Sequence, residues 1–340
     1  MSERERHLAR PAESIAVEPR TIAELLDAMG RTGFQGRSLA NAFEVFVRMI
    51  EAEDNTIFLG YAGSLSTTGQ SGIVRWLIEN RFVDVVVATG ANLSEDIFEG
   101  LGFRYYQGTH LADDAELLRL QIDRFYDIYA DELEYRRLEA FIGEFIGTLE
   151  SGSVHSSAGF LRRFGEFQLA RGVESITASA FGAGVPVFSP GLADSGYGVA
   201  ATLYAREHDH TVVLDQFADF RELAQIGERA GKTSVIYVGG GVPKDTIQLV
   251  TVMVDLGRGG DQLAPHAYAV QITTDSPQWG GLSGCTFEEA ISWGKIDEGA
   301  ARAVCYCDAT IALPILAHAL LERGVERPAA PNFGWLKTGD

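Results

Sequence analysis

The chain has 340 residues, of which 46% are hydrophobic, and its 47 acidic and 28 basic side chains give a formal net charge of −19. This apolar content is enough for a large buried core, so the composition excludes a disordered chain. The acidic balance argues against a nucleic-acid partner, because binding to phosphates needs a cationic face. It permits a cationic ligand without demanding one.

The sequence also bears on where the protein works. No apolar run reaches the roughly 18–20 residues that a membrane span needs, and residues 1–7 are too charged for a secretory signal. Cys285, Cys305 and Cys307 are odd in number, and two of them lie two positions apart, which is not a disulfide framework. We therefore expect a cytoplasmic protein without membrane association.

Hydrophobic periodicity predicts the elements in chain order. Residues 1–20 are polar and are predicted to form a mobile arm, and helices are predicted at 22–29 and 39–49. Apolar runs then alternate with helical segments. Strands are predicted at residues 56–59, 83–88, 185–188, 211–214, 234–238, 267–273 and 304–307. Further helices are predicted at residues 73–78, from Ser94 onward, and across most of 113–149.

Near-continuous apolar strands separated by helices indicate a parallel sheet that is covered on both faces. We predict an α/β fold with a single Rossmann-like domain over residues 21–330, plus the N-terminal helical arm and a C-terminal tail at 331–340. Small-residue loops follow Leu59, Ala88, Phe188, Val238 and Thr273. Because ligands bind at the carboxyl ends of parallel strands, these loops are expected to converge on one site.

Three local patterns have simpler interpretations than catalysis or metal binding. Residues 196–201 match a G-x-G-x-x-A dinucleotide fingerprint, but a loop of about seven residues separates them from the preceding strand, which favours structural glycines. His208 and His210 lie in a charged stretch that is typical of a solvated turn. Cys305 and Cys307 share one face of a predicted strand, which favours core packing. No metal site is predicted.

The segment at residues 268–296 carries the most chemistry. It holds two tryptophans, a Gly-Gly-Leu-Ser-Gly turn at 280–284, the pair Glu288-Glu289, and Lys295 close to Trp293. An apolar setting favours the neutral form of a lysine, and a neutral amine is a nucleophile that can form a Schiff base. On composition alone, an exposed lysine that follows a helix remains the alternative.

The order of motifs resembles the deoxyhypusine synthase family. The lysine motif is Ser292-Trp293-Gly294-Lys295-Ile296, and the matching stretches are spread from about residue 20 to residue 320. The further matches are Thr-Gly-Ala-Asn-Leu-Ser-Glu-Asp at 89–96, Pro-Val-Phe-Ser-Pro at 186–190, Gly-Gly-Gly-Val-Pro-Lys at 239–244 and Asp-Ala at 308–309. Five motifs in the same order are far more specific than any one of them.

The resemblance implies an NAD-dependent transferase that assembles as a homotetramer. In such an enzyme, NAD takes hydride from spermidine, and the resulting imine passes to the lysine, here Lys295, as diaminopropane leaves. The aminobutyl group then moves to an acceptor amine and is reduced there. Either a protein lysine or a small diamine such as putrescine could be the acceptor.

The resemblance also assigns site residues by position. It places NAD against Gly63, Ser64, Leu65, Ser66, Thr67, Thr89, Gly90, Ala91, Glu95, Asp194, Gly240, Thr274, Asp275, Asp308 and Ala309. It places the polyamine against Glu289, Trp293, Asp245, Glu95, Gly280 and Gly281, with Lys295 as the nucleophile. The physics agrees, because Trp293 offers a π face to a cationic carbon chain and Glu289 can pair with a terminal ammonium.

Three positions depart from the pattern of eukaryotic members. Asp245 replaces a histidine, and Val199 and Leu282 each replace an aspartate. We expect the lysine chemistry to persist and the donor or acceptor amine to have changed. The altered amine site mildly favours a small diamine, or an unknown amine, as acceptor. A non-catalytic NAD- or polyamine-binding relative and a plain NAD-dependent amine dehydrogenase remain as alternatives.

Overall fold

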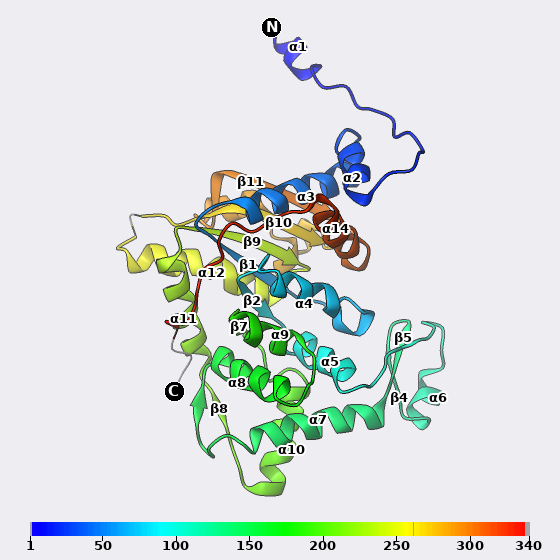
Figure 1. Ribbon diagram of the computed structural model, residues 1–340, viewed down its shortest axis with the longest axis vertical. Helices are drawn as coiled ribbons and strands as arrows, with labels where there is room; N and C mark the ends of the chain where they lie inside the picture. The colour runs from blue at the N-terminus through cyan, green and yellow to red at the C-terminus, as the bar shows by residue number, and fades with distance from the viewer. Residues whose placement is uncertain (1, 261, 337–340) are drawn as a thin grey trace.

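A parallel sheet forms the centre of the protein. The computed structural model describes residues 2–260 and 262–336, and within them six strands pair side by side in the order β11-β10-β9-β1-β2-β7, all parallel (Figure 1). The strands are β1 (Asn55–Tyr61), β2 (Val85–Ala88), β7 (Val187–Phe188), β9 (Lys232–Val238), β10 (His266–Thr273) and β11 (Ile296–Tyr306). The predicted parallel α/β fold is confirmed.

Alternation along the strands divides the interior into two cores. Ile57 and Leu59 of β1 point into one core, whereas Phe58 between them points into the other, as the period of two requires. Both faces are covered, so all seven residues of β1 are buried. Helices that contribute to the first core include α2 (Ile22–Gly30), α3 (Phe34–Glu51), α4 (Ser71–Glu79) and α14 (Ala309–Arg323). Those that pack into the second include α11 (Gln216–Arg229), α12 (Gly241–Gly257) and α13 (Phe287–Ser292).

The chain between β2 and β8 builds the part drawn below the sheet in Figure 1. Its helices are α5 (Gly90–Gly100), α6 (Asp114–Arg119), α7 (Glu132–Ile146), α8 (Ser157–Leu169), α9 (Ile176–Ala183) and α10 (Gly196–His208). The stretch 113–149 is mostly helical, as predicted, but β4 (Ile122–Phe125) and β5 (Ile128–Asp131), which were not predicted, separate α6 from α7 and pair antiparallel with each other, and β5 pairs with β3 (Tyr106–Gln107). Tyr126 adopts a φ of 55° between β4 and β5, and this left-handed residue turns the chain back.

The strand predicted at 211–214 forms, but it does not join the main sheet. β8 (Val213–Leu214) pairs instead with β6 (Val154–His155) in a separate two-stranded sheet. Both strands are two residues long, and Val213 is exposed, so this pair lacks the two buried faces of the central strands. Apolar composition alone does not distinguish these two roles.

The amino-terminal segment stands apart from the body. The helix α1 (Glu3–His7) begins with a capping box between Ser2 and Glu5 and buries none of its residues, and the chain runs from it toward α2 without regular structure (Figure 1). The predicted helical arm is therefore present, and its mobility stays a prediction. Among the described residues, no helix combines the length and the apolar character needed to cross a membrane.

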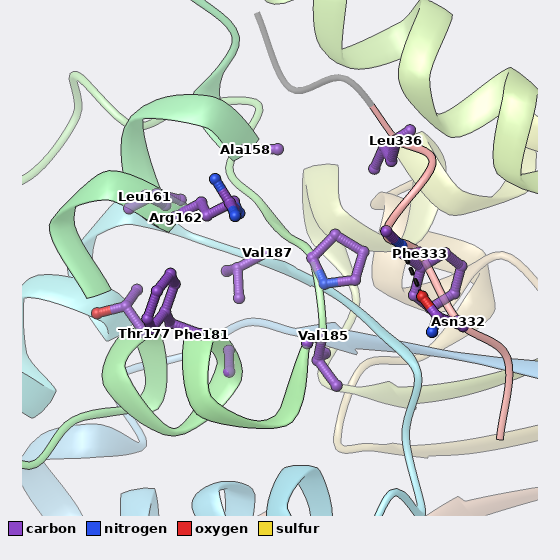
Figure 2. A pocket seen from close by; sticks show the side chains of 14 residues that line it. Ala158, Leu161, Arg162, Thr177, Phe181, Val185, Val187, Asn332, Phe333 and Leu336 are labelled. Carbon is purple, nitrogen blue, oxygen red and sulfur yellow. Dashed lines mark hydrogen bonds between the residues drawn. The ribbon is translucent and has the colours of Figure 1, made fainter. Parts of the chain in front are cut away.

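The carboxyl-terminal segment runs along the amino ends of the strands. Arg327 donates to Oδ2 of the buried Asp84 at 2.7 Å and to the carbonyl of Asn55 at 2.5 Å, and Arg81 donates to the carbonyl of Pro331 at 2.7 Å. Between this segment and helices α8 and α9 lies a cavity of about 280 Å³ with mostly apolar walls (Figure 2). It borders the amino end of β7. Residues 337–340 of the predicted tail lie outside the described residues.

Candidate active site

The strand order reverses at β1, where ligands of parallel sheets bind. β2 and β7 lie on one side of β1, and β9, β10 and β11 lie on the other. Two cavities in the described part of the chain flank the first turns of α12, which follows β9. Val242 and Pro243 line one of them, and Lys244 and Asp245 line the other.

The cavity between α12 and α13, which we call the lysine pocket, has a volume of about 280 Å³. It brings together all the residues assigned to the amine except Glu95. Its walls are formed by Lys244, Asp245, Gln248, Pro277, Gly280, Gly281, Leu282, Cys285, Glu289, Ala290, Trp293 and Lys295. Of the three departures from the family pattern, Asp245 and Leu282 line this pocket, whereas Val199 lies on α10 and does not.

Lys295 is held at the entry to β11. The helix α13 ends at Ser292, and Gly294 with a φ of 67° turns the chain so that Lys295 donates its backbone N–H to the carbonyl of Ala290 at 3.0 Å. Its Nζ lies 4.0 Å from Oδ1 of Asp245 and 5.3 Å from the centre of the Trp293 ring. The side chain is 15% exposed. The lysine therefore combines restricted solvent access with a carboxylate and an aromatic face.

A second lysine lies deeper in the same pocket. Lys244 is 2% exposed, and its Nζ donates to Oε1 of Gln271 at 2.8 Å and to the carbonyl of Cys285 at 2.5 Å. Burial, with a smaller contribution from Lys295, lowers the pKa of Lys244 to about 8 against the opposing effects of Cys285, Glu289 and Asp245. Sequence reasoning gave no role to Lys244 or to Gln248. Their spacing could have indicated a role. Residues three or four apart share a helix face, and Gln248 is four positions from Lys244 and three from Asp245.

The second cavity, which we call the cofactor cavity, has a volume of about 310 Å³ and lies over the carboxyl ends of β1, β2 and β7. Its lining includes six residues assigned to NAD, namely Gly63, Ser64, Thr89, Gly90, Ala91 and Asp194. The helix α5 begins beside it without a side-chain cap on its first N–H groups, whereas at the start of α12 the N–H of Gly241 donates to Oγ of Ser283 at 3.2 Å. Uncapped helix starts bind phosphate groups, so these residues fit the pyrophosphate of a dinucleotide.

Other residues assigned to NAD lie outside the lining of both cavities. Leu65, Ser66 and Thr67 lie behind the lining, where the backbone N–H groups of Leu65 and Ser66 donate to Oδ1 of Asn92 at 3.1 and 3.3 Å. Gly240 packs against Ser283, since a Cβ on it would lie 2.5 Å from the Cα of that residue. The exposed members of this group are Thr274, Asp275 and Asp308, and Asp308 caps α14, in which Ala309 is the first residue.

Glu95 lies just behind the cofactor cavity, and its pKa is raised above the usual value of a glutamate. It is 8% exposed and accepts a hydrogen bond from Oγ of Ser64, which lines the cavity, at 3.3 Å. Burial raises the pKa of Glu95 from 4.5 to about 7, against the opposing effect of the Ser64 hydroxyl. The carboxyl group can therefore change protonation near neutral pH.

This shift predicts a pH dependence of stability. Between pH 4.5 and about 7 the folded protein holds a proton on Glu95 that the unfolded chain has lost, so the free energy of unfolding falls as pH rises through this window. The fall is at most about 3 kcal/mol. When urea unfolding is measured between pH 5 and pH 8, Glu95→Gln should lose this part of the fall and keep the smaller part due to Asp96, Asp123 and Asp219, whose pKa values burial raises to about 6. Glu99→Gln, an exposed change on the same helix, is the control. Parallel pH profiles for wild type and Glu95→Gln would contradict the prediction.

Comparisons with known proteins agree with this arrangement. The sequence profile of the deoxyhypusine synthase family matches residues 24–320. A "probable deoxyhypusine synthase 2" of Archaeoglobus fulgidus is 46% identical over 91% of this chain and all of its own, and one of Methanosarcina mazei is 44% identical over 96% and 94%. A "deoxyhypusine synthase-like protein" of Chlorobaculum tepidum is 35% identical over 96% of this chain and 94% of its own.

A solved structure supports the fold. A crystal structure of an Entamoeba histolytica protein proposed to be a deoxyhypusine synthase superposes with a TM-score of 0.62 at 16% identity, covering 91% of this chain and 95% of that one. The motifs around Lys295, the two cavities at the switch in strand order and the match over residues 24–320 coincide. The chain belongs to the deoxyhypusine synthase family.

Proposed function

We propose that this protein is an NAD-dependent transferase that moves an aminobutyl group from spermidine, or a related polyamine, to an acceptor amine through an imine on Lys295. The observation that carries the proposal is the setting of Lys295. Its Nζ shares a pocket with two carboxylates, Asp245 and Glu289, and lies 5.3 Å from the centre of the Trp293 ring. A nucleophile beside acceptors for ammonium groups suits a polyamine.

The cofactor cavity supports a dinucleotide next to this pocket. Its small residues and the uncapped start of α5 suit a pyrophosphate, and Asp194 offers a carboxylate for ribose hydroxyls. NAD, when bound, would take a hydride from the donor amine and return it to the product. The two cavities lie on either side of the same helical turn, Val242 to Asp245, which supports the proposal that cofactor and amine bind next to each other.

Residues of the lysine pocket are proposed to carry out the transfer and to bind the amine. Nζ of Lys295 attacks the imine carbon of the donor, a new C–N bond forms, and the C–N bond to diaminopropane breaks as the proton of Lys295 leaves on the departing nitrogen. Oδ1 of Asp245, at 4.0 Å from Nζ of Lys295, can accept a hydrogen of the donor amine as it arrives at Lys295. Glu289 pairs with a terminal ammonium, and Trp293 covers the carbon chain. As a family member, the protein is also proposed to be a cytoplasmic homotetramer.

Trapping the imine tests the proposal directly. When the protein is incubated with NAD and spermidine and then reduced with borohydride, mass spectrometry should find an aminobutyl adduct on the peptide that contains Lys295. The exposed Lys232 serves as an internal control, because an adduct there as well would indicate unspecific chemistry. An unmodified Lys295 with each of several polyamines would contradict the proposal.

Asp245 favours a small diamine over a protein lysine as acceptor. It adds a second carboxylate to a pocket that already holds Glu289, and two carboxylates can accept both ammonium groups of a diamine. Incubation with NAD, spermidine and putrescine should therefore yield homospermidine. The alternative acceptor predicts product only when a protein lysine substrate is present.

A further inference from the structure

One wall of the lysine pocket is a segment with little regular structure. Residues 280–285, which we call the wall segment, contribute four residues to the lining, namely Gly280, Gly281, Leu282 and Cys285. The segment contains one short 3-10 turn, and its first three residues are exposed. A short exposed segment of this kind gains little stability from its own packing. Its position therefore depends on contacts with neighbouring elements.

Three hydrogen bonds join the wall segment to those elements. Nζ of Lys244 donates to the carbonyl of Cys285 at 2.5 Å. Nε2 of Gln271 donates to the carbonyl of Ser283 at 2.8 Å. Oγ of Ser283 accepts from the backbone N–H of Gly241 at 3.2 Å. Two of the three donors belong to the first turn of α12 and the third belongs to β10, so the wall segment is attached to the central part of the fold.

Lys244 takes part in two of these contacts, one of them indirectly. Its buried Nζ also donates to Oε1 of Gln271 at 2.8 Å, so the amide oxygen of Gln271 faces the ammonium and the amide nitrogen faces the wall segment. Both acceptors of Nζ are uncharged. A buried ammonium destabilises the fold relative to an apolar side chain unless its hydrogen bonds compensate. A lysine at this position therefore indicates that its contacts serve the site.

We propose that Lys244 is a positioning residue that stabilises the wall segment against α12 and so gives the lysine pocket the shape that the donor amine requires, an inference that rests on the proposed function. Lys244 acts through the backbone of Cys285 and through Gln271, without contact to the amine. Val242 and Pro243 of the same turn line the cofactor cavity, and they make none of these contacts. Loss of Lys244 should therefore affect the amine and spare NAD.

Binding measurements test this difference. Lys244→Met keeps the length of the side chain and removes its N–H groups, and it should weaken spermidine binding in the presence of NAD about 10-fold or more. The affinity for NAD alone should stay within about two-fold of wild type. Calorimetry measures both affinities.

Asn55→Leu is the matched control for a general loss of buried hydrogen bonds. Asn55 is also buried and has two side-chain hydrogen bonds, to the carbonyl of Met49 and from Oγ of Ser234. It lies at the amino end of β1, whereas both cavities lie at the other end of the sheet. Asn55→Leu should change neither affinity.

The thiol of Cys285 reports on the wall segment without any polyamine. It is half-buried and lines the pocket, and Cys307, which is also half-buried but lies outside the pocket, is an internal reference. Burial raises the pKa of the Cys285 thiol, and the charge of Lys244 opposes this effect. Because the thiolate is the reactive form, electrostatics alone would slow alkylation of Cys285 in Lys244→Met. A released wall segment should instead make its alkylation by iodoacetamide about 10-fold faster relative to Cys307.

A second variant covers the case in which Lys244→Met does not fold. Ser283→Ala removes the bond from Gly241 at a partly buried position, and it should accelerate alkylation of Cys285 by a smaller factor. Alkylation of Cys285 at the wild-type rate or slower in Lys244→Met, or in Ser283→Ala where only that variant folds, would overturn the proposal. So would an unchanged spermidine affinity in a variant whose Cys285 reacts faster.

The borohydride experiment keeps the two proposals apart. Faster alkylation of Cys285 in Lys244→Met together with an unmodified wild-type Lys295 would support the role of Lys244 in the wall segment and refute the transfer reaction. An adduct on wild-type Lys295 together with unchanged alkylation of Cys285 would support the transfer and refute the role of Lys244.

Discussion

Lys295→Ala is expected to lower kcat for aminobutyl transfer by about 10⁴-fold or more, because it removes the atom that we propose to carry the transferred group. The same change should leave the affinity for NAD within a few-fold of wild type, since Lys295 lines the lysine pocket and not the cofactor cavity. Product formation by chromatography and NAD binding by calorimetry measure the two effects.

Two further variants make this result specific. Lys295→Arg keeps the cation beside Asp245, but a guanidinium does not form the imine, so its activity should be as low as that of the alanine variant. Lys232→Ala removes an exposed lysine of β9 and should retain full activity. Turnover in Lys295→Ala above one hundredth of the wild-type rate, roughly a 3 kcal/mol limit on the lost stabilisation, would falsify the imine mechanism.

Arg327→Met is expected to lower the free energy of unfolding by about 4 kcal/mol, because it leaves the carboxylate of Asp84 buried without its closest cation. Asp84 is fully buried and the side chain of Arg327 is 4% exposed, with 2.7 Å between Oδ2 and the guanidinium. Burial raises the pKa of Asp84, and Arg327 opposes this effect. Urea unfolding at pH 7 measures the loss.

A double variant tests whether the stranded charge causes the loss, and an exposed ion pair serves as the control. Adding Asp84→Asn to Arg327→Met removes the stranded charge, so the double variant should recover at least half of the lost stability. Arg124→Met breaks an ion pair of similar length, 2.6 Å, with the exposed Asp114, and it should change stability by less than about 1 kcal/mol. Equal losses in the two single variants would show that burial of Asp84 does not govern the effect.

The central sheet could be read from the sequence because its strands are short, apolar and separated by helices. The run 56–59 lies within β1, and 234–238 lies within β9, its neighbour. The segment 113–149 was harder to assign. Its hairpin is half-buried and charged, so periodicity did not separate β4 and β5 from the helices beside them. In the fingerprint-like stretch, a Cβ on Gly198 would lie 2.0 Å from the carbonyl oxygen of Ala193, which supports a packing role.

The site divides in a similar way. Motifs placed Lys295, Trp293, Glu289 and Asp245 in one pocket before any coordinates, and the structure brings them together. The same motifs included Lys244 without a role, although it donates to Gln271 and Cys285 within the pocket. The requirement for these contacts comes from segments that are 27 and 41 residues away in the sequence, so no local pattern records it.

Sequence alone determined the fold class and the family resemblance and singled out Lys295 as the candidate nucleophile, because these depend on local periodicity and on the order of short motifs. Tertiary structure decided which polar groups are buried and which of them have partners. The net charge of −19 permitted a cationic ligand, but only the packing of the folded chain buries Oε1 of Gln248 without a hydrogen-bond partner. Solvent exclusion is a property of the assembled chain, and it gives a single amide oxygen its energetic weight.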